Sequence, residues 1–142
     1  MIVPDINLLM YAHIGSFPHH AKARAWWEGL MNGRVDVGIA GPVLFGFLRL
    51  ATNRKVIDPA MSVDVAVGHA ESWLARPHVH FLSPGARHLD IAFALLRHLG
   101  TGGNLTTDAQ IAATAIEHQA ELHSNDVDFR RFRQLRWRDP IA

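Results

Sequence analysis

Short apolar segments with the character of β-strands alternate along this chain with longer segments of helical periodicity. In residues 34–40, Val35, Val37 and Ile39 recur at a period of two, which is typical of a strand. The other predicted strands are the apolar segments 1–5, 78–82 and 121–124. Strands separated by helices pair in parallel through right-handed crossovers. The order therefore predicts one α/β domain over residues 1–142, with three layers (α/β/α) around a mainly parallel central sheet.

Helical segments fill the intervals between these strands. The predicted helices cover residues 6–13, 19–31, 41–50, 62–75, 89–99 and 106–119, and residues 125–132 form a final helical piece. Helix 89–99 shows the clearest apolar spacing, and helix 106–119 begins with a threonine or aspartate suited to an N-cap. Trp26 and Trp27 are adjacent in helix 19–31, so we expect one to be buried and the other to mark an exposed apolar patch.

Composition excludes several classes of protein. The chain is 49% hydrophobic and 19% charged, as in a globular domain, and its apolar runs are far shorter than the ~20 residues that span a bilayer. The first residues lack the basic region of a signal peptide, so we expect a cytoplasmic protein without a membrane segment. Cysteine is absent, and no two of the ten histidines form a helical metal-binding pair, so a zinc site is not expected.

Acidic residues occur where this fold should gather them. Asp5 follows the first predicted strand, Asp126 follows the last, Asp108 begins a helix, and Asp128 is two residues beyond Asp126. Active sites of such folds lie at the carboxyl ends of the strands. Two carboxylates about 5 Å apart repel each other by roughly 3 kcal/mol at an effective dielectric near 20. A divalent cation such as Mg²⁺ or Mn²⁺ would offset that repulsion, which predicts a metal-dependent hydrolase.

Each aspartate also has a purely structural explanation. Asp5 and Asp108 could cap helices, Asp126 could close an Asx-turn, and Asp128 could be a solvated charge near a helix start. Capping does not explain why all four fall at one edge of the sheet. We therefore favour the metal site for the set and leave the capping roles open for individual members.

Four segments resemble the motifs of a known family. PDINLLMYA, GFLRLATN, TDAQIAA and SNDVDFRRF are similar, in order and spacing, to the motifs of PIN-domain ribonucleases, in particular the VapC-type toxins of bacterial toxin–antitoxin pairs. The resemblance covers nearly the whole chain. It implies an endoribonuclease that uses Mg²⁺ or Mn²⁺ and cleaves structured RNA such as tRNA or rRNA. It also implies a homodimer and a VapB-type antitoxin that blocks the site.

The resemblance assigns roles to individual residues. The metal-binding aspartates correspond to Asp5, Asp108 and Asp126, the fourth acidic residue to Asp128, and the supporting polar positions to Asn7 and Ser124. By this assignment the four aspartates are the catalytic residues.

One position departs from the family pattern. Many PIN domains carry a glutamate on the third helix, where this chain has Gly46. The loss of that carboxylate predicts weaker occupancy of any second metal position. It also supports an alternative, a catalytically degenerate PIN-like module that binds RNA or a protein. A phosphotransfer enzyme of the haloacid-dehalogenase or receiver type is less favoured, because it needs an aspartate where Asn7 stands and a nearby lysine.

Basic residues are unevenly distributed. Arg49 is a candidate phosphate contact or a surface charge of the third helix, and both readings stay open. Segment 129–138 contains five arginines interleaved with Phe129, Phe132 and Trp137. The arginines could follow an RNA backbone, contact the antitoxin or form a solvated face, whereas the two phenylalanines are predicted to lie in the core.

Overall fold

A five-stranded parallel sheet forms the centre of the molecule. The computed structural model describes residues 1–142. Its strands are β1 (Ile2–Pro4), β2 (Val37–Ala40), β3 (Val79–Leu82), β4 (Glu121–His123) and β5 (Arg136–Arg138). They lie in the order β3-β2-β1-β4-β5, and every neighbouring pair is parallel. The predicted parallel sheet is confirmed, with a fifth strand that the sequence did not predict.

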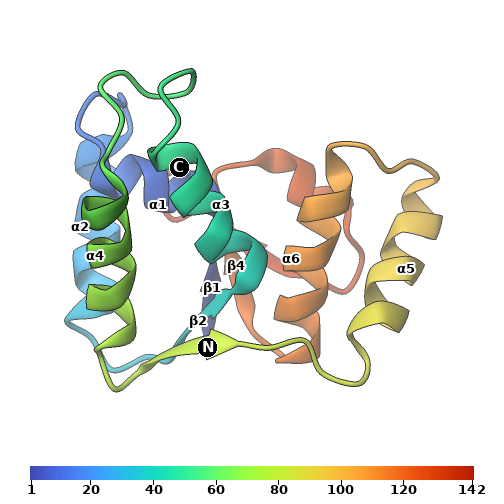
Figure 1. Cartoon of the computed structure of the whole chain (residues 1–142). Helices are drawn as coiled ribbons and strands as arrows, with labels where there is room; N and C mark the ends of the chain where they lie inside the picture. Colours follow the sequence, from blue (N-terminus) through green and yellow to red (C-terminus); the bar gives the residue numbers. More distant parts are fainter.

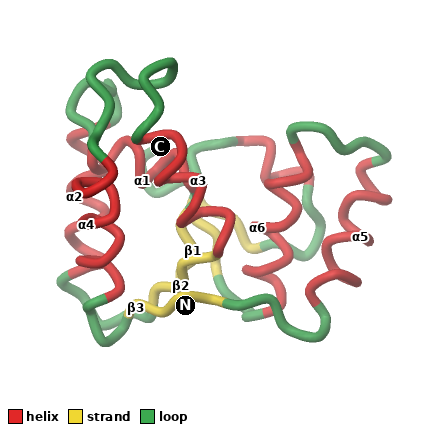
Figure 2. Tube along the Cα trace, viewed as in Figure 1, coloured by secondary structure: helices red, strands yellow, loops and turns green.

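Helices cover both sides of this sheet. They are α1 (Ile6–His13), α2 (His20–Met31), α3 (Gly41–Ala51), α4 (Val63–Leu74), α5 (His88–Leu99), α6 (Leu105–Glu117) and the 3-10 helix η1 (Val127–Arg131). Figure 1 shows α2 and α4 on one side of the strands and α5 and α6 on the other, and Figure 2 shows the helix and strand layers in the same view. The three-layer α/β/α architecture is therefore confirmed. No helix combines the length and the apolar character needed to span a membrane.

The pairing of β1 with β4 positions the candidate site. Pro4 pairs with His123 at the carboxyl ends of the two strands. Asp5 and Ser124 are consequently the next residues on adjacent parallel strands, and the Asp5 N–H donates to the His123 carbonyl at 2.9 Å. Residues 119 positions apart in the chain become neighbours because β1 lies beside β4 in the middle of the sheet.

An aromatic cluster fills the core between α1, α2, α3 and α4. Trp27, Phe47 and Trp73 are buried around His13, with ring centroids 5.1–6.2 Å from the imidazole. The Trp73 indole donates to His13 Nε2 at 3.0 Å, so the imidazole proton lies on Nδ1, which contacts the Leu9 carbonyl at 2.7 Å. Burial lowers the pKa of His13 to about 4. This histidine is thus a neutral residue packed within the aromatic cluster.

Two expectations about individual residues were wrong. Val35 lies outside β2 and is exposed, because the β1–β2 ladder begins only at the pair of Ile2 and Val37. In α5 the apolar spacing identified the helix, but Leu89 and Phe93 are 60% and 50% exposed. Helix α5 packs mainly against α6, so half of its apolar stripe faces away from the core.

Candidate active site

Asp5 joins the end of β1 to the start of α1. Its Oδ1 accepts the N–H of Ile6 at 2.7 Å, so the residue caps α1 as its structural explanation required. Its Oδ2 accepts the hydroxyl of Ser124 at 2.7 Å. The side chain is only 6% exposed. A cap alone needs one carboxylate oxygen and no burial, so this position holds Asp5 more tightly than capping demands.

Ser124 links two of the predicted site residues. Its side chain is completely buried; it donates to Asp5, and its hydroxyl oxygen accepts the Asp126 N–H at 3.0 Å. Asp126 in turn accepts the Asp128 N–H at 2.9 Å and caps η1, as in an Asx-turn. Asp128 itself is exposed. The structure thus places Asp5, Ser124 and Asp126 in one hydrogen-bonded chain at the carboxyl edge of the sheet.

Asp108 reaches the same edge from α6. The predicted threonine or aspartate N-cap was wrong, because α6 begins at Leu105 with Asn104 in the cap position. Asp108 is therefore the fourth residue of the helix and caps nothing, which removes its structural explanation. Its side chain is half-buried.

The carboxylates influence one another electrostatically. Burial raises the pKa of Asp5 to about 6, with a further rise from Asp126, although hydrogen bonds from Ser124 and Ile6 lower it. Burial likewise raises the pKa of Asp108 to about 7, and the charges of Asp5, Asp126 and Asp128 add to this rise. At this edge of the sheet the negatively charged form of Asp5 and of Asp108 is therefore disfavoured, and a bound cation would stabilise it.

The donor atoms fit a hard divalent cation, although they do not form a closed set. No three histidine, aspartate or glutamate side chains lie close enough together to form a metal-binding group. A pocket of about 270 Å³ contains Asp5, Asn7 and Asp126 in its lining. The Oδ1 atom of Asn7 is buried and accepts no hydrogen bond, so it is an additional unused oxygen. Oxygen donors of this kind are those that Mg²⁺ and Mn²⁺ prefer.

Two other predicted features of the site have a different environment. Arg49 is exposed on α3 and forms no ion pair with any aspartate. Gly46 is buried, and a Cβ atom built there would lie 2.5 Å from Cδ1 of Ile6. The Ile6 side chain therefore occupies the space where a larger residue at position 46 would begin.

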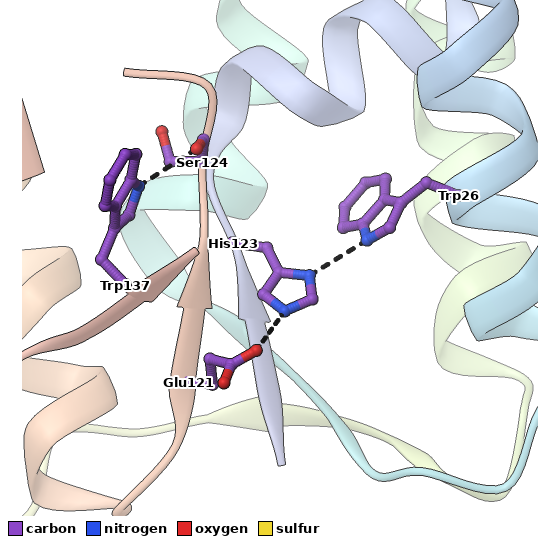
Figure 3. Close-up of polar contacts among 5 residues, drawn as sticks. All are labelled: Trp26, Glu121, His123, Ser124 and Trp137. Carbon is purple, nitrogen blue, oxygen red and sulfur yellow. Dashed lines mark hydrogen bonds and ion pairs between the residues drawn. The ribbon is translucent and has the colours of Figure 1, made fainter. Parts of the chain in front are cut away.

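A second layer of contacts behind Ser124 was not predicted from the sequence. The Trp137 indole donates to the Ser124 carbonyl at 3.1 Å, and the Ser124 N–H donates to the Arg138 carbonyl at 3.1 Å. Figure 3 shows the neighbouring His123 between Trp26 and Glu121. The Trp26 indole donates to Nδ1 at 3.0 Å, and Nε2–H donates to Glu121 at 2.7 Å.

These contacts fix the protonation state of His123. Since a tryptophan indole can only donate, Nδ1 of His123 carries no proton. Burial lowers the pKa of His123, although Glu121 raises it, and the charge of Arg138 lowers it further. A neutral His123 thus joins α2 to β4 immediately before Ser124. The only sequence signal for this layer was the interleaving of aromatic and basic residues near the end of the chain.

Comparison with known families agrees with this arrangement. The family model described as "PIN domain" matches residues 2–135. The chain belongs to the PIN domain family. The resemblance inferred from the motifs is thereby confirmed, and the carboxylates described above lie within the matched residues.

Relatives of this PIN domain are named ribonucleases. Ribonuclease VapC33 of Mycobacterium tuberculosis is 50% identical over 141 residues, which cover 99% of each chain. Ribonuclease VapC37 of the same organism is 38% identical over 142 residues, covering 100% of this chain and 99% of that one.

Solved structures share the fold at lower identity. VapBC2 from Rickettsia felis, bound to a DNA fragment from its promoter, has a TM-score of 0.70 at 22% identity and covers 97% of this chain and 98% of its own. Mycobacterium tuberculosis VapC20, a toxin that cleaves the sarcin–ricin loop, has a TM-score of 0.68 at 18% identity, covering 96% and 99%. These structures show that the PIN domain here has the fold of VapC proteins.

Replacing Ser124 by Ala should destabilise this PIN domain. The change leaves Asp5 Oδ2 and the Asp126 N–H without their partner, and an unpaired buried polar group costs about 1–3 kcal/mol. Urea unfolding at neutral pH measures the difference. Ser72→Ala is the matched control, because Ser72 is exposed on α4 and its loss should cost less than about 0.5 kcal/mol. Equal effects of the two variants would show that the bridge does not hold the site.

Proposed function

We propose that this chain is a VapC-type endoribonuclease toxin that hydrolyses phosphodiester bonds of RNA. Its full-length relatedness to VapC33 and VapC37, which are named ribonucleases, supports the activity. Solved VapBC pairs that share the fold support a VapB-type antitoxin as partner. A cytoplasmic location is part of the same proposal. The further properties of the family, a tRNA or rRNA substrate and a homodimer, complete the proposal.

The observation that carries the proposal is the set of four carboxylates at one edge of the sheet, where the charges of Asp5, Asp126 and Asp128 all act on Asp108. Asp5, Asp108 and Asp126 would hold Mg²⁺ or Mn²⁺, with Asn7 Oδ1 as a neighbouring oxygen. When bound, the ion would neutralise charge on the scissile phosphate and lower the pKa of the attacking water. The raised pKa values of Asp5 and Asp108 show carboxyl groups whose charged form a divalent cation would stabilise.

The chain's own residues have distinct tasks in this reaction. Ser124 fixes the orientation of Asp5 through its hydroxyl and that of Asp126 through the backbone N–H. Asp128, exposed and two residues beyond Asp126, would orient a water molecule and accept its proton. The hydrogen bonds and burial of Asp5 leave it little freedom to move, so Asp5 would be the fixed ligand and Asp108 and Asp126 would adjust to the cation.

A non-catalytic binding module is the second candidate function. The specific observation in its favour is that Ile6 fills the space beside Gly46, where many PIN domains carry a glutamate. Such a module would bind RNA or an antitoxin but would not cut RNA. The retention of four carboxylates with raised pKa values at two of them favours the enzyme.

Removal of metal should abolish cleavage. We expect the purified chain to cut total bacterial RNA with Mn²⁺ or Mg²⁺, and to lose at least about 10²-fold in rate with EDTA, because nothing else neutralises the transition state. Gel analysis of RNA after dialysis against EDTA, followed by restoration of Mn²⁺, measures this. Cleavage that persists in EDTA would contradict the metal-dependent mechanism. An absence of cleavage with either metal, with RNA binding retained, would favour the binding module.

A further inference from the structure

Strand β5 carries basic side chains away from the core. The aromatic residues of segment 129–138 anchor it: Phe129 and Phe132 are buried, and Trp137 is partly buried under Arg130, whose guanidinium lies 5.2 Å from the ring centroid. The five arginines, Arg130, Arg131, Arg133, Arg136 and Arg138, are all exposed. The expectation that the two phenylalanines lie in the core is confirmed. Arg136 and Arg138 lie on the edge strand β5, and the other three arginines precede it in the chain.

The pairing of β5 with β4 shows on which side of the sheet the side chains of Arg136 and Arg138 lie. Arg136 pairs with Glu121 and Arg138 pairs with His123, so both arginines lie on the side of the sheet that faces α2. Residues two apart along a strand are about 6.6 Å apart. That spacing is close to the distance between neighbouring phosphates of an extended RNA strand. Lys22 of α2 and Arg138 line the same cavity of about 490 Å³, together with Trp26 and His123.

The acidic side chains beside Arg136 and Arg138, those of Glu121 and Asp139, make hydrogen bonds to other groups. Glu121 accepts a hydrogen bond from His123, and Asp139 accepts from the Asn125 side chain at 2.8 Å and the Ile141 N–H at 3.0 Å. No ion pair in the chain includes Lys22 or Arg138. Arg136 uses one N–H group to bind the Gln119 carbonyl and keeps the others. Lys22 and Arg138 therefore have cationic groups without an ion-pair partner, which fit a polyanionic partner.

The cavity lies beside the acidic site. His123 in its wall accepts a hydrogen bond from Trp26 of α2 and directly precedes Ser124, whose hydroxyl donates to Asp5. A phosphate held in this cavity would therefore lie on the α2 side of the strand end that carries the carboxylates. Trp26 in the wall of the cavity offers an aromatic side chain to an adjoining base.

We propose that Lys22 and Arg138 form a phosphate-binding surface that holds the backbone of the RNA strand entering the acidic site. This inference rests on the proposed function for the identity of the polyanion. The position of this surface beside the carboxylates that would hold the cation favours RNA over an acidic peptide segment of the antitoxin.

The test measures binding separately from cleavage. Fluorescence anisotropy of a labelled single-stranded 20-nucleotide RNA in EDTA, at several KCl concentrations, compares the wild type with Lys22→Gln/Arg138→Gln. We expect at least about 10-fold weaker binding for this variant and a salt slope smaller by about 1.4, since each lost phosphate contact on a single strand removes about 0.7. Thermal denaturation checks that the variant is still folded. We expect it to be, because the side chains of Lys22 and Arg138 are both exposed.

A charge-matched control separates a local surface from bulk charge. Arg24→Gln/Arg34→Gln removes the same charge from exposed positions, since Arg24 lies on the opposite side of α2 from Lys22 and Arg34 precedes β2. It should change RNA affinity less than about two-fold, because neither position touches the proposed path. Lys22→Arg/Arg138→Lys keeps both charges and should retain most of the binding.

The outcomes distinguish this surface from the nuclease itself. Equal losses in the two charge-removing variants, or unchanged RNA binding with weaker antitoxin binding, would overturn the surface and leave metal-dependent cleavage standing. Selective loss of RNA binding in a chain that cuts no RNA would support the surface and overturn the enzyme. Selective loss of binding together with a higher KM for cleavage would support both.

Discussion

Replacing Asp5 by Asn is expected to lower RNA cleavage by about 10²–10³-fold, the usual loss when one group that stabilises transition-state charge is removed. Asp5 is the most constrained carboxylate of the site, held by Ile6 and Ser124 and almost fully buried. Asparagine keeps an oxygen for the Ile6 N–H and so preserves the cap of α1. It loses the charge that would hold the cation. The measurement is kcat/KM on RNA at saturating Mn²⁺.

A matched substitution separates this effect from a general change in charge. Asp64→Asn removes an exposed carboxylate from the first turn of α4, and activity should change less than about two-fold because no site group is touched. Thermal denaturation of Asp5→Asn, expected within a few degrees of the wild type, excludes unfolding as the cause. If Asp5→Asn kept a tenth or more of the wild-type activity, Asp5 would be a helix cap and not a metal ligand.

The acidic site could be predicted because its members follow local rules. Asp5 and Asp126 come after apolar strands, and a parallel sheet brings such positions to one edge. No local rule predicts that Asp5 and Ser124 are in contact. Their contact depends on the strand order, in which β1 lies beside β4 as well as beside β2. The resemblance to PIN domains supplied the position of Ser124, and only the structure showed its two hydrogen bonds.

Elements without an apolar signature could not be predicted. Strand β5 reads Arg-Trp-Arg, which alternates charge with one aromatic residue, and it is an edge strand that pairs with β4 alone. Trp26 and His123 are in contact although they are 97 positions apart in the chain, and no pattern in either segment predicts this contact. The start of α6 was misplaced because Thr106, Thr107 and Asp108 suit a cap, whereas the helix begins at Leu105.

Replacing Asp108 by Asn should abolish cleavage and, at the same time, stabilise the metal-free protein. The rate should fall about 10²–10³-fold, because a charged ligand is lost from the site. The stability should rise because Asp108 is half-buried among three other carboxylates, which raises its pKa to about 7. A gain of about 1–3 kcal/mol at pH 8 is expected after allowance for solvent screening and for the lost helix-dipole interaction.

The direction of the pH dependence follows from the raised pKa. In the unfolded chain Asp108 loses its proton near pH 3.8, whereas the folded chain keeps it until about pH 7. The folded state therefore binds more protons between these values, and its stability falls as the pH rises through this window. Asparagine does not titrate. The advantage of Asp108→Asn should thus be small near pH 4, grow up to about pH 7 and stay constant above it.

Thermal denaturation with and without metal tests both halves of this prediction. In EDTA at pH 8, Asp108→Asn should melt about 3–8 °C above the wild type. Added Mn²⁺ should raise the melting temperature of the wild type, since it binds only the folded state, and should leave that of Asp108→Asn nearly unchanged. Asp90→Asn, in the exposed first turn of α5, is the control and should be neutral or slightly destabilising. If Asp108→Asn melted below the wild type, Asp108 would stabilise the fold. That result would contradict the prediction that Asp108 destabilises the metal-free protein and serves as a metal ligand.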